Sequence, residues 1–158
     1  MSLDIVDVKI DLTKKARYMA GGNITHPPSS MTYASVVSLE SVRINLLVYA
    51  LNGIVILSGD THNKYLNAET KHKTFFYTGD EWKYDQGKVV VILRYLYGLK
   101  SSALARNNYL EDLLGNYMGF TSFITNPDIW FNSSTEKYIN QYYTYILVYV
   151  DDIIIMDR

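Results

Sequence analysis

The segment Tyr142–Ile155 places two adjacent carboxylates, Asp151 and Asp152, inside an otherwise aromatic and β-branched run. Val, Ile, Tyr and Thr dominate this run, and these residue types favour a β-strand over a helix. Because burying an unpaired carboxylate costs far too much free energy, the two aspartates must lie either in a solvated turn or beside a cation. We expect the rest of the chain to be organised around this pair.

Two interpretations of the segment are open at this level. In the simpler one, Ile146–Val150 and Ile153–Met156 are the strands of a hairpin with a solvated Asp-Asp turn, because Asp is common in turns. In the other, the tip of the hairpin holds Mg²⁺ against a phosphate through carboxylate oxygens. Other parts of the sequence help to decide between a solvated turn and a Mg²⁺ site.

Composition restricts the class of protein. The chain has 158 residues, of which 48% are hydrophobic and 20% charged, which is enough for one globular domain with a real core. Cysteine is absent, so disulfides, thiolate zinc sites and thiol catalysis are excluded. No apolar run approaches the roughly 20 residues of a membrane helix, and Met1–Lys15 does not resemble a signal peptide. We therefore expect an intracellular protein without a membrane partner.

The formal net charge is −1, from 15 basic and 16 acidic residues. A nucleic-acid-binding protein usually has a basic surplus, so this balance argues mildly against such a partner. Basic residues nevertheless cluster near the N-terminus, and a basic patch facing an acidic pocket is compatible with the sequence. Most of the 15 tyrosines are expected to pack in the core or on the surface, although Tyr can also stack on bases.

Hydrophobic spacing predicts two helices, Ser38–Asn52 and Ser101–Tyr117, each with Ser at its start and Gly beyond its end. Strand patterns occur at residues 4–20, with a turn at Lys14–Arg17, and at Ile54–Leu57, Thr74–Tyr77, Lys88–Leu93, Ile129–Phe131, Ile146–Val150 and Ile153–Met156. This order favours an α+β fold, with two helices on one face of an antiparallel sheet in a split βαβ arrangement.

A third carboxylate, Asp60, also follows a short apolar strand. Two-metal phosphoryl transfer requires carboxylates that hold two Mg²⁺ ions about 3.5–4 Å apart. Adjacent residues of a strand point to opposite faces, so Asp151 and Asp152 alone do not suffice. A split βαβ arrangement allows Asp60 to lie on a strand next to the Asp151–Asp152 tip, which makes it the candidate third ligand.

Six segments, in order along the chain, resemble sequence boxes of copia-type (LTR) retrotransposon reverse transcriptases. They are Lys15–Arg17, Thr32–Arg43, Asp60–Asn67, Tyr95–Lys100, Asn126–Asp128 and Leu147–Ile153. The last contains Tyr-Val-Asp-Asp, which resembles the catalytic box of that family, and the fourth contains its Leu-Tyr-Gly-Leu-Lys segment. Together the boxes cover nearly the whole chain, and their order is specific where any one alone would be weak.

The resemblance implies a reverse-transcriptase-like palm with partial fingers, belonging to a Pol polyprotein. Residues 1–158 would form a single truncated domain, with fingers strands and loop at about 1–35 and a palm and fingers core at 36–158. The thumb and ribonuclease H domains are expected to be absent. The implied activity is RNA-directed DNA polymerisation, with an RNA or DNA template-primer and dNTP as partners. The implied cellular location of the protein is either a virus-like particle in the cytoplasm or the nucleus.

The resemblance also assigns roles to residues. Asp60, Asp151 and Asp152 would be the catalytic carboxylates and would bind two Mg²⁺ ions, which Mn²⁺ could replace. The nucleotide-binding residues would be Tyr65, Tyr149, Lys15 and Arg17. The ring of Tyr65 would exclude a 2′-hydroxyl, and the two basic residues would lie near the triphosphate. The structural alternative for Lys15 and Arg17 is a solvated basic turn without a function. For Tyr65 the alternative is packing in the core.

Some residues depart from the family pattern. Lys64 replaces the usual Ala before the gate aromatic, and Arg106 stands on a face where a Trp would pack. We expect His26, His62 and His72 to be solvent-exposed rather than ligands. The alternative function is a catalytically inactive relic or a nucleic-acid-binding module that keeps the palm fold. A generic α+β protein with a solvated Asp-Asp turn is the third hypothesis.

Overall fold

The computed structural model describes residues 2–22, 32–136 and 139–158 of the chain. These residues form two compact units. Unit 1 comprises Met1–Ala34 and Asn63–Tyr109, and unit 2 comprises Ser35–His62 and Leu110–Arg158. Each unit is therefore assembled from two separate stretches of sequence.

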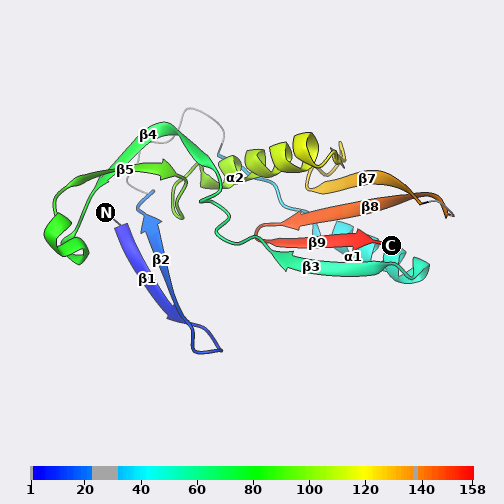
Figure 1. The fold of residues 1–158 in the computed structure, drawn as a ribbon, viewed down its shortest axis with the longest axis horizontal. Helices are drawn as coiled ribbons and strands as arrows, with labels where there is room; N and C mark the ends of the chain where they lie inside the picture. Colours follow the sequence, from blue (N-terminus) through cyan, green and yellow to red (C-terminus); the bar gives the residue numbers. More distant parts are fainter. Residues whose placement is uncertain (1, 23–31, 137–138) are drawn as a thin grey trace. The chain divides into compact units, whose positions relative to one another are not determined.

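Unit 1 contains two antiparallel strand pairs, which Figure 1 shows as β1 with β2 and β4 with β5. Its elements are β1 (Ser2–Val8), β2 (Lys14–Ala20), β4 (Glu69–Tyr77), the 3₁₀ helix η1 (Asp80–Asp85), β5 (Val89–Arg94) and the start of α2 (Ser102–Glu111). The rings of Tyr18, Phe76 and Trp82 form a cluster, with centroids 5.3 Å apart for Tyr18 and Phe76. Aromatic packing thus ties β2 to β4 and to η1.

The glycine of the Leu-Tyr-Gly-Leu-Lys segment has a packing role in unit 1. Gly98 lies at φ +89°, and a Cβ there would collide with the carbonyl oxygen of Ala20. A Cβ on Gly22 would collide in turn with the carbonyl of Gly98. The Ala20 N–H donates to the carbonyl of Tyr97 at 2.7 Å. Only glycine allows the two backbones to approach this closely.

Unit 2 is built on an antiparallel five-stranded sheet in the order β3-β9-β8-β7-β6. Figure 1 labels the first four of these strands. Its strands are β3 (Val55–Asp60), β6 (Thr121–Ser122), β7 (Ile129–Glu136), β8 (Ile139–Tyr149) and β9 (Asp152–Asp157). The unit also contains α1 (Leu39–Asn52), the end of α2 and the π-helix η2 (Asp112–Tyr117). The predicted α+β composition, the hairpin around Asp151 and Asp152, and the strand before Asp60 are confirmed. The turn of the hairpin consists of Val150 and Asp151 rather than of the two aspartates, and Asp152 begins β9.

The first predicted helix is confirmed, together with its caps. Ser38 is the N-cap, and its side chain accepts a hydrogen bond from the Ser41 N–H at 3.1 Å. Gly53 ends the helix in the left-handed conformation, at φ +62°. A polar side chain at the N-cap satisfies a backbone donor that the first turn leaves without a helical partner, and glycine adopts the left-handed region without a Cβ penalty.

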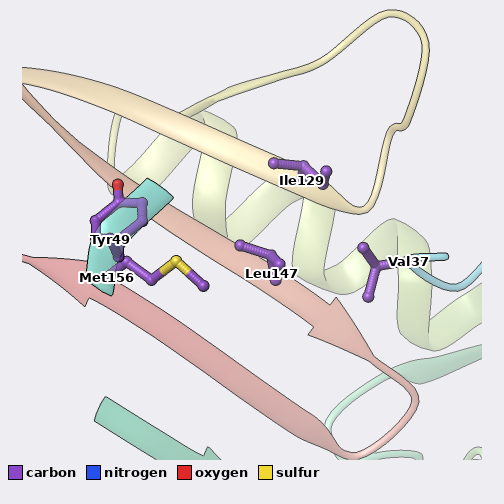
Figure 2. Close-up of a cluster of buried hydrophobic side chains, with 5 residues drawn as sticks. All are labelled: Val37, Tyr49, Ile129, Leu147 and Met156. Carbon is purple, nitrogen blue, oxygen red and sulfur yellow. The ribbon is translucent and has the colours of Figure 1, made fainter. Parts of the chain in front are cut away.

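Two clusters of buried side chains cover opposite faces of the sheet. One contains Val37, Tyr49, Ile129, Leu147 and Met156, and Figure 2 shows these side chains together beside β7, β8 and β9. The other contains Leu110, Leu114, Trp130, Ile146 and Val148. Neighbouring residues of β7 and β8 alternate between the two clusters, as the side chains of a strand must.

The expectation of two helices on one face is therefore wrong. α1 packs on the first cluster through Tyr49, whereas the end of α2 and η2 pack on the second through Leu110 and Leu114. The reason is visible in β8, where Ile146, Leu147 and Val148 are all buried and both faces consequently need a cover.

Local differences from the sequence expectations are small. The strand predicted at Ile129–Phe131 extends further, to Glu136, as β7. The second predicted helix changes from α to π geometry at Asp112 and ends before Gly119, which lies at φ +72°. Among residues 2–22, 32–136 and 139–158, no helix has the length and apolar character needed to cross a bilayer.

Candidate active site

The hairpin formed by β8 and β9 carries the Asp-Asp pair at its tip. Tyr149 and Asp152 are cross-strand partners, so Val150 and Asp151 form a two-residue turn between them. Val150 lies at φ +50°, in the left-handed region that such turns require and that β-branched residues disfavour. Backbone strain of this kind is concentrated at functional sites, where the surrounding structure maintains it.

The strand β3 lies beside β9 and brings Asp60 to the hairpin tip. The antiparallel register pairs Asp60 with Asp152, and Gly59 with Ile153. Directly opposed residues of an antiparallel pair project to the same face, with Cβ atoms about 4.5–5.5 Å apart. Because Tyr149 also opposes Asp152, the side chains of Tyr149, Asp152 and Asp60 form one row across three strands.

Thr61 links the end of β3 to the turn. Its backbone N–H and its Oγ1 hydroxyl both donate to the carbonyl oxygen of Asp151, at 2.8 and 2.9 Å. One residue therefore supplies two hydrogen bonds that hold the Asp151 backbone beside Asp60. Sequence reasoning missed this role, although the position of Thr61 directly after the first aspartate was available as a signal.

Two backbone hydrogen bonds of the buried residue Val148 hold β8 just before the turn. Val148 is 3% exposed, its carbonyl accepts from the Val37 N–H at 3.3 Å, and its own N–H donates to the Asp128 carbonyl at 3.0 Å. Asp128 is itself buried, and its Oδ2 has no hydrogen-bond partner among the described residues. The sequence singled out Asn126–Asp128 only as a segment resembling the family, so the burial of this carboxylate was not anticipated.

The three candidate metal ligands differ in exposure. Asp60 and Asp152 are exposed, whereas Asp151 is half-buried and its Oδ1 is covered. Like charges directly opposite each other on neighbouring strands repel, and a cation between them would offset that repulsion. In the part of the chain that the structure describes, no group of three or more Asp, Glu, His or Cys side chains is placed so that it could hold a metal ion.

The residues expected to contact the nucleotide fall in both units. Tyr149 lies beside Asp152 in unit 2 and is 51% exposed. Tyr65, Lys15 and Arg17 belong to unit 1. Lys15 and Arg17 lie in β2 rather than in the predicted turn, opposite Asp7 and Ile5 of β1. Lys15 is half-buried, and the side chain of Arg17 is outside the described residues.

Tyr65 is held by two neighbours in unit 1. Its ring meets the ring of Tyr97 edge-on, with centroids 4.7 Å apart. The Nζ of Lys64 lies 4.7 Å from the Tyr65 centroid and 5.9 Å from the Tyr97 centroid. Lys64 is only 6% exposed, and its ammonium group lies within cation–π distance of both rings. The departure from the family pattern at Lys64 thus has a local structural explanation.

The remaining sequence expectations concern Arg106 and the histidines. Arg106 is buried, as its position on an expected core face indicated, and its Nη1 donates to the Asn107 side chain at 3.0 Å. His62 is exposed, as expected. His26 and the side chain of His72 lie outside the described residues.

Comparison with known proteins gives one result. Residues 4–158 match the family model described as reverse transcriptase (RNA-dependent DNA polymerase). No curated protein and no solved structure matches the chain with significance.

Proposed function

Because the chain belongs to the reverse transcriptase (RNA-dependent DNA polymerase) family, we propose that it carries the polymerase site of a copia-type retrotransposon enzyme. The family acts on a nucleic-acid template and on dNTPs. One observation carries the site assignment. The register of β3 and β9 sets Asp60 directly opposite Asp152, beside the turn that contains Asp151.

The donor set suits Mg²⁺, because all three side chains are carboxylates and Mg²⁺ prefers oxygen ligands. In this proposal Asp60, Asp151 and Asp152 hold two Mg²⁺ ions, which Mn²⁺ can replace. When bound, the ions would supply Lewis-acid stabilisation of the attacking and leaving oxygens in nucleotidyl transfer. The contribution of the chain is to keep the three carboxylates at one end of one sheet, with Thr61 tying the Asp151 turn to β3.

Other residues would position the nucleotide. Tyr149 presents an exposed ring next to Asp152, where it can pack against the nucleotide or the primer end. Tyr65 would be the aromatic gate that excludes a 2′-hydroxyl, with Tyr97 and Lys64 fixing the orientation of its ring. Lys15 and Arg17 would neutralise the triphosphate, since fixed positive charge stabilises developing negative charge.

The proposal extends to the context of the chain. The palm-like unit 2 would operate within a Pol polyprotein whose other domains grip the primer and degrade the RNA strand. Such a polyprotein would act in the cytoplasm, inside a virus-like particle, or in the nucleus.

Primer extension on poly(rA)·oligo(dT) with Mg²⁺ tests the function. Replacing Asp60, Asp151 or Asp152 by Asn should reduce extension by at least about 100-fold, as for other groups that stabilise transition-state charge. The matched control is Asp157→Asn, at the other end of β9, where the amide oxygen can still accept the hydrogen bond that Thr144 donates at 2.8 Å. Equal activity of Asp151→Asn and the wild type would refute the assignment.

A second candidate function is a non-catalytic nucleic-acid-binding module with the same fold. It is favoured by the finding that the described residues include no group of three acidic or histidine side chains placed to hold a metal ion. Nucleic-acid binding without any Asp151-dependent extension would identify this alternative. In that case the affinity should fall steeply with salt, because binding to phosphates releases counterions.

A further inference from the structure

Lys64 is a buried cation beside the ring of Tyr65, at the position where the family pattern usually has alanine. It is 6% exposed, and its Nζ lies 4.7 Å from the ring centroid of Tyr65 and 5.9 Å from that of Tyr97. Burying an ammonium group costs free energy that an apolar side chain of the same length would not cost. The placement of this charge against two rings therefore calls for an explanation beyond the filling of space.

Tyr97, which meets the Tyr65 ring edge-on with centroids 4.7 Å apart, is fixed through its own backbone. Its carbonyl accepts from the Ala20 N–H at 2.7 Å, and Met19 and Tyr97 form a parallel β-bridge. The next residue, Gly98, approaches Ala20 so closely that a Cβ would collide with the Ala20 carbonyl. Tyr97 is thus anchored on β2 and gives the Tyr65 ring a fixed surface to pack on.

The main chain of Tyr65 is held separately from its ring. Its carbonyl accepts from the Ala68 N–H at 3.2 Å, and the Ala68 carbonyl accepts from the Tyr95 N–H at 3.0 Å. These bonds fix the backbone, but they do not determine the side-chain torsions of Tyr65. The torsions are set by the groups on which the ring packs, which include the Lys64 ammonium over its face and the ring of Tyr97.

The contact with Lys64 is strong enough to affect the orientation of the ring. A cation over an aromatic face is attracted more strongly when it is desolvated, as Lys64 is, than when it lies in water. Such a contact changes the population of the favoured ring orientation by roughly 2- to 30-fold. Tyr65 itself is only half-buried, so part of its ring stays accessible to a ligand.

We propose that Lys64 is a positioning residue that, through the ring of Tyr65, sets the preference of this chain for deoxyribonucleotides over ribonucleotides. The inference rests on the proposed function, in which the Tyr65 ring excludes a 2′-hydroxyl. A ring held in one orientation excludes the hydroxyl at every encounter, whereas a ring that rotates away admits it in a fraction of encounters. Lys64 thus acts on the nucleotide through Tyr65.

Single-nucleotide incorporation on poly(rA)·oligo(dT) tests the proposal, through the ratio of kcat/KM for dTTP to kcat/KM for UTP. Lys64→Met keeps the length of the side chain and removes its charge, and it should lower this ratio by about 2- to 30-fold. The fall should come from better use of UTP, with kcat for dTTP nearly unchanged. Lys64→Arg should keep the wild-type ratio, because arginine retains the charge and stacks on aromatic rings.

Two substitutions of Tyr97 test the other side of the arrangement. Tyr97→Phe keeps the ring and should keep the dTTP-to-UTP ratio. Tyr97→Leu removes the ring and should lower the ratio.

The matched control is Lys88→Met, because Lys88 belongs to the same unit, has a side chain that is 65% exposed and pairs with Asp85. This variant should keep the wild-type ratio, and circular dichroism shows whether each variant is folded. An unchanged ratio in Lys64→Met would overturn the proposal. So would equal falls in Lys64→Met and Lys64→Arg, since shape rather than charge would then be responsible, or an equal fall in Lys88→Met.

A spectroscopic measurement tests the contact without any nucleotide. Protons that lie over an aromatic ring resonate upfield, so the Cε protons of Lys64 should give an upfield-shifted signal in the NMR spectrum of a chain with isotope-labelled lysine. Lys64→Met identifies this signal by removing it, and Tyr97→Leu should reduce its shift. Absence of a shifted lysine signal that Lys64→Met removes would show that the ammonium group does not lie over the rings, and the proposal would fail.

The inference and the proposed function can fail separately. Asp151-dependent extension with a ratio that Lys64→Met leaves unchanged overturns the role of Lys64 alone. If the chain extends no primer, the catalytic function fails, and the ratio of the dissociation constants for UTP and dTTP is measured instead of the kinetic ratio. Lys64→Met should then narrow that difference in affinity, and an unchanged ratio or no binding of either nucleotide overturns the role of Lys64 as well.

Discussion

Replacing Thr61 by Val tests how the turn with Asp151 is held. The Thr61 hydroxyl donates to the Asp151 carbonyl at 2.9 Å, and the Thr61 backbone N–H donates to the same oxygen at 2.8 Å. Valine keeps the shape of the side chain and removes only the hydroxyl. One hydrogen bond of this type contributes about 0.5–1.5 kcal/mol to stability. Because the backbone N–H still satisfies the carbonyl, we expect a loss of about 0.5–1 kcal/mol, in the lower part of that range.

The stability loss can be measured for unit 2 by itself. Trp130 lies in a buried cluster of that unit, whereas Trp82 belongs to unit 1. In a Trp82→Phe background, tryptophan fluorescence during urea unfolding therefore reports on unit 2. For a chain of this size, about 0.5–1 kcal/mol corresponds to a fall of about 1–4 °C in Tm.

The functional consequence concerns the proposed metal site. If the lost hydrogen bond serves to position Asp151, a change of about 0.5–1 kcal/mol lowers Mn²⁺ affinity by about 2- to 5-fold. Mn²⁺ binding can be measured by electron paramagnetic resonance without primer or nucleotide. The matched control is Thr144→Val, which removes a 2.8 Å hydrogen bond to Asp157 at the other end of the same hairpin. That variant should lose stability and keep its Mn²⁺ affinity.

Two results would refute this reasoning. Unchanged stability and Mn²⁺ affinity in Thr61→Val would show that the hydroxyl does not hold the turn. Equal losses of affinity in Thr61→Val and Thr144→Val would show a general loosening of the sheet rather than local positioning. If the wild type binds no Mn²⁺, the proposed metal site is wrong, and the unfolding measurement still tests the hydrogen bond.

Three further predictions concern backbone and burial. Val150→Gly should raise Tm in calorimetry by about 1–4 °C, because glycine relieves the strain at φ +50° at little cost in burial, and a lower Tm would contradict this. Gly98→Ala should destabilise unit 1 by about 2 kcal/mol or more in urea unfolding, since its Cβ would meet the Ala20 carbonyl at a positive φ. Burial raises the pKa of Tyr49, so the folded chain keeps this proton after the unfolded chain has lost it, and stability should fall as pH rises above about 10. Tyr49→Phe should make that fall less steep in urea unfolding between pH 9 and 11, and it should cost little at pH 7 because the hydroxyl's contact with the Tyr143 carbonyl is long, at 3.4 Å.

The sequence by itself determined the features that depend on neighbouring residues. Ser38 and Gly53 bound the first helix because a cap needs only a side-chain oxygen or a missing Cβ at the right place. The hairpin around Asp151 and Asp152 followed from β-branched residues on either side of two charges. The resemblance to reverse transcriptases was likewise readable from the chain, and residues 4–158 match that family.

Features that depend on distant residues needed the tertiary structure. α1 carries apolar residues around its whole circumference, including the exposed Ile44 and Leu47 as well as the buried Tyr49, so its sequence does not say which face packs or on which side of the sheet. The exposure of Phe75 could not be foreseen either, because Phe75 and Phe76 are the same residue type and only packing against Tyr18 and Trp82 decides between them.

The arrangement of Asp60, Asp151 and Asp152 depends both on local sequence and on the pairing of distant strands. Local sequence was enough to place Asp151 and Asp152 at a hairpin tip and Asp60 at the end of a strand. It could not supply the pairing of β3 with β9, since strands separated by more than 90 residues are brought together by the burial of the whole sheet rather than by local preference. Tertiary structure therefore decided that Asp60 lies opposite Asp152, and that Thr61 donates hydrogen bonds to Asp151 in the adjoining turn.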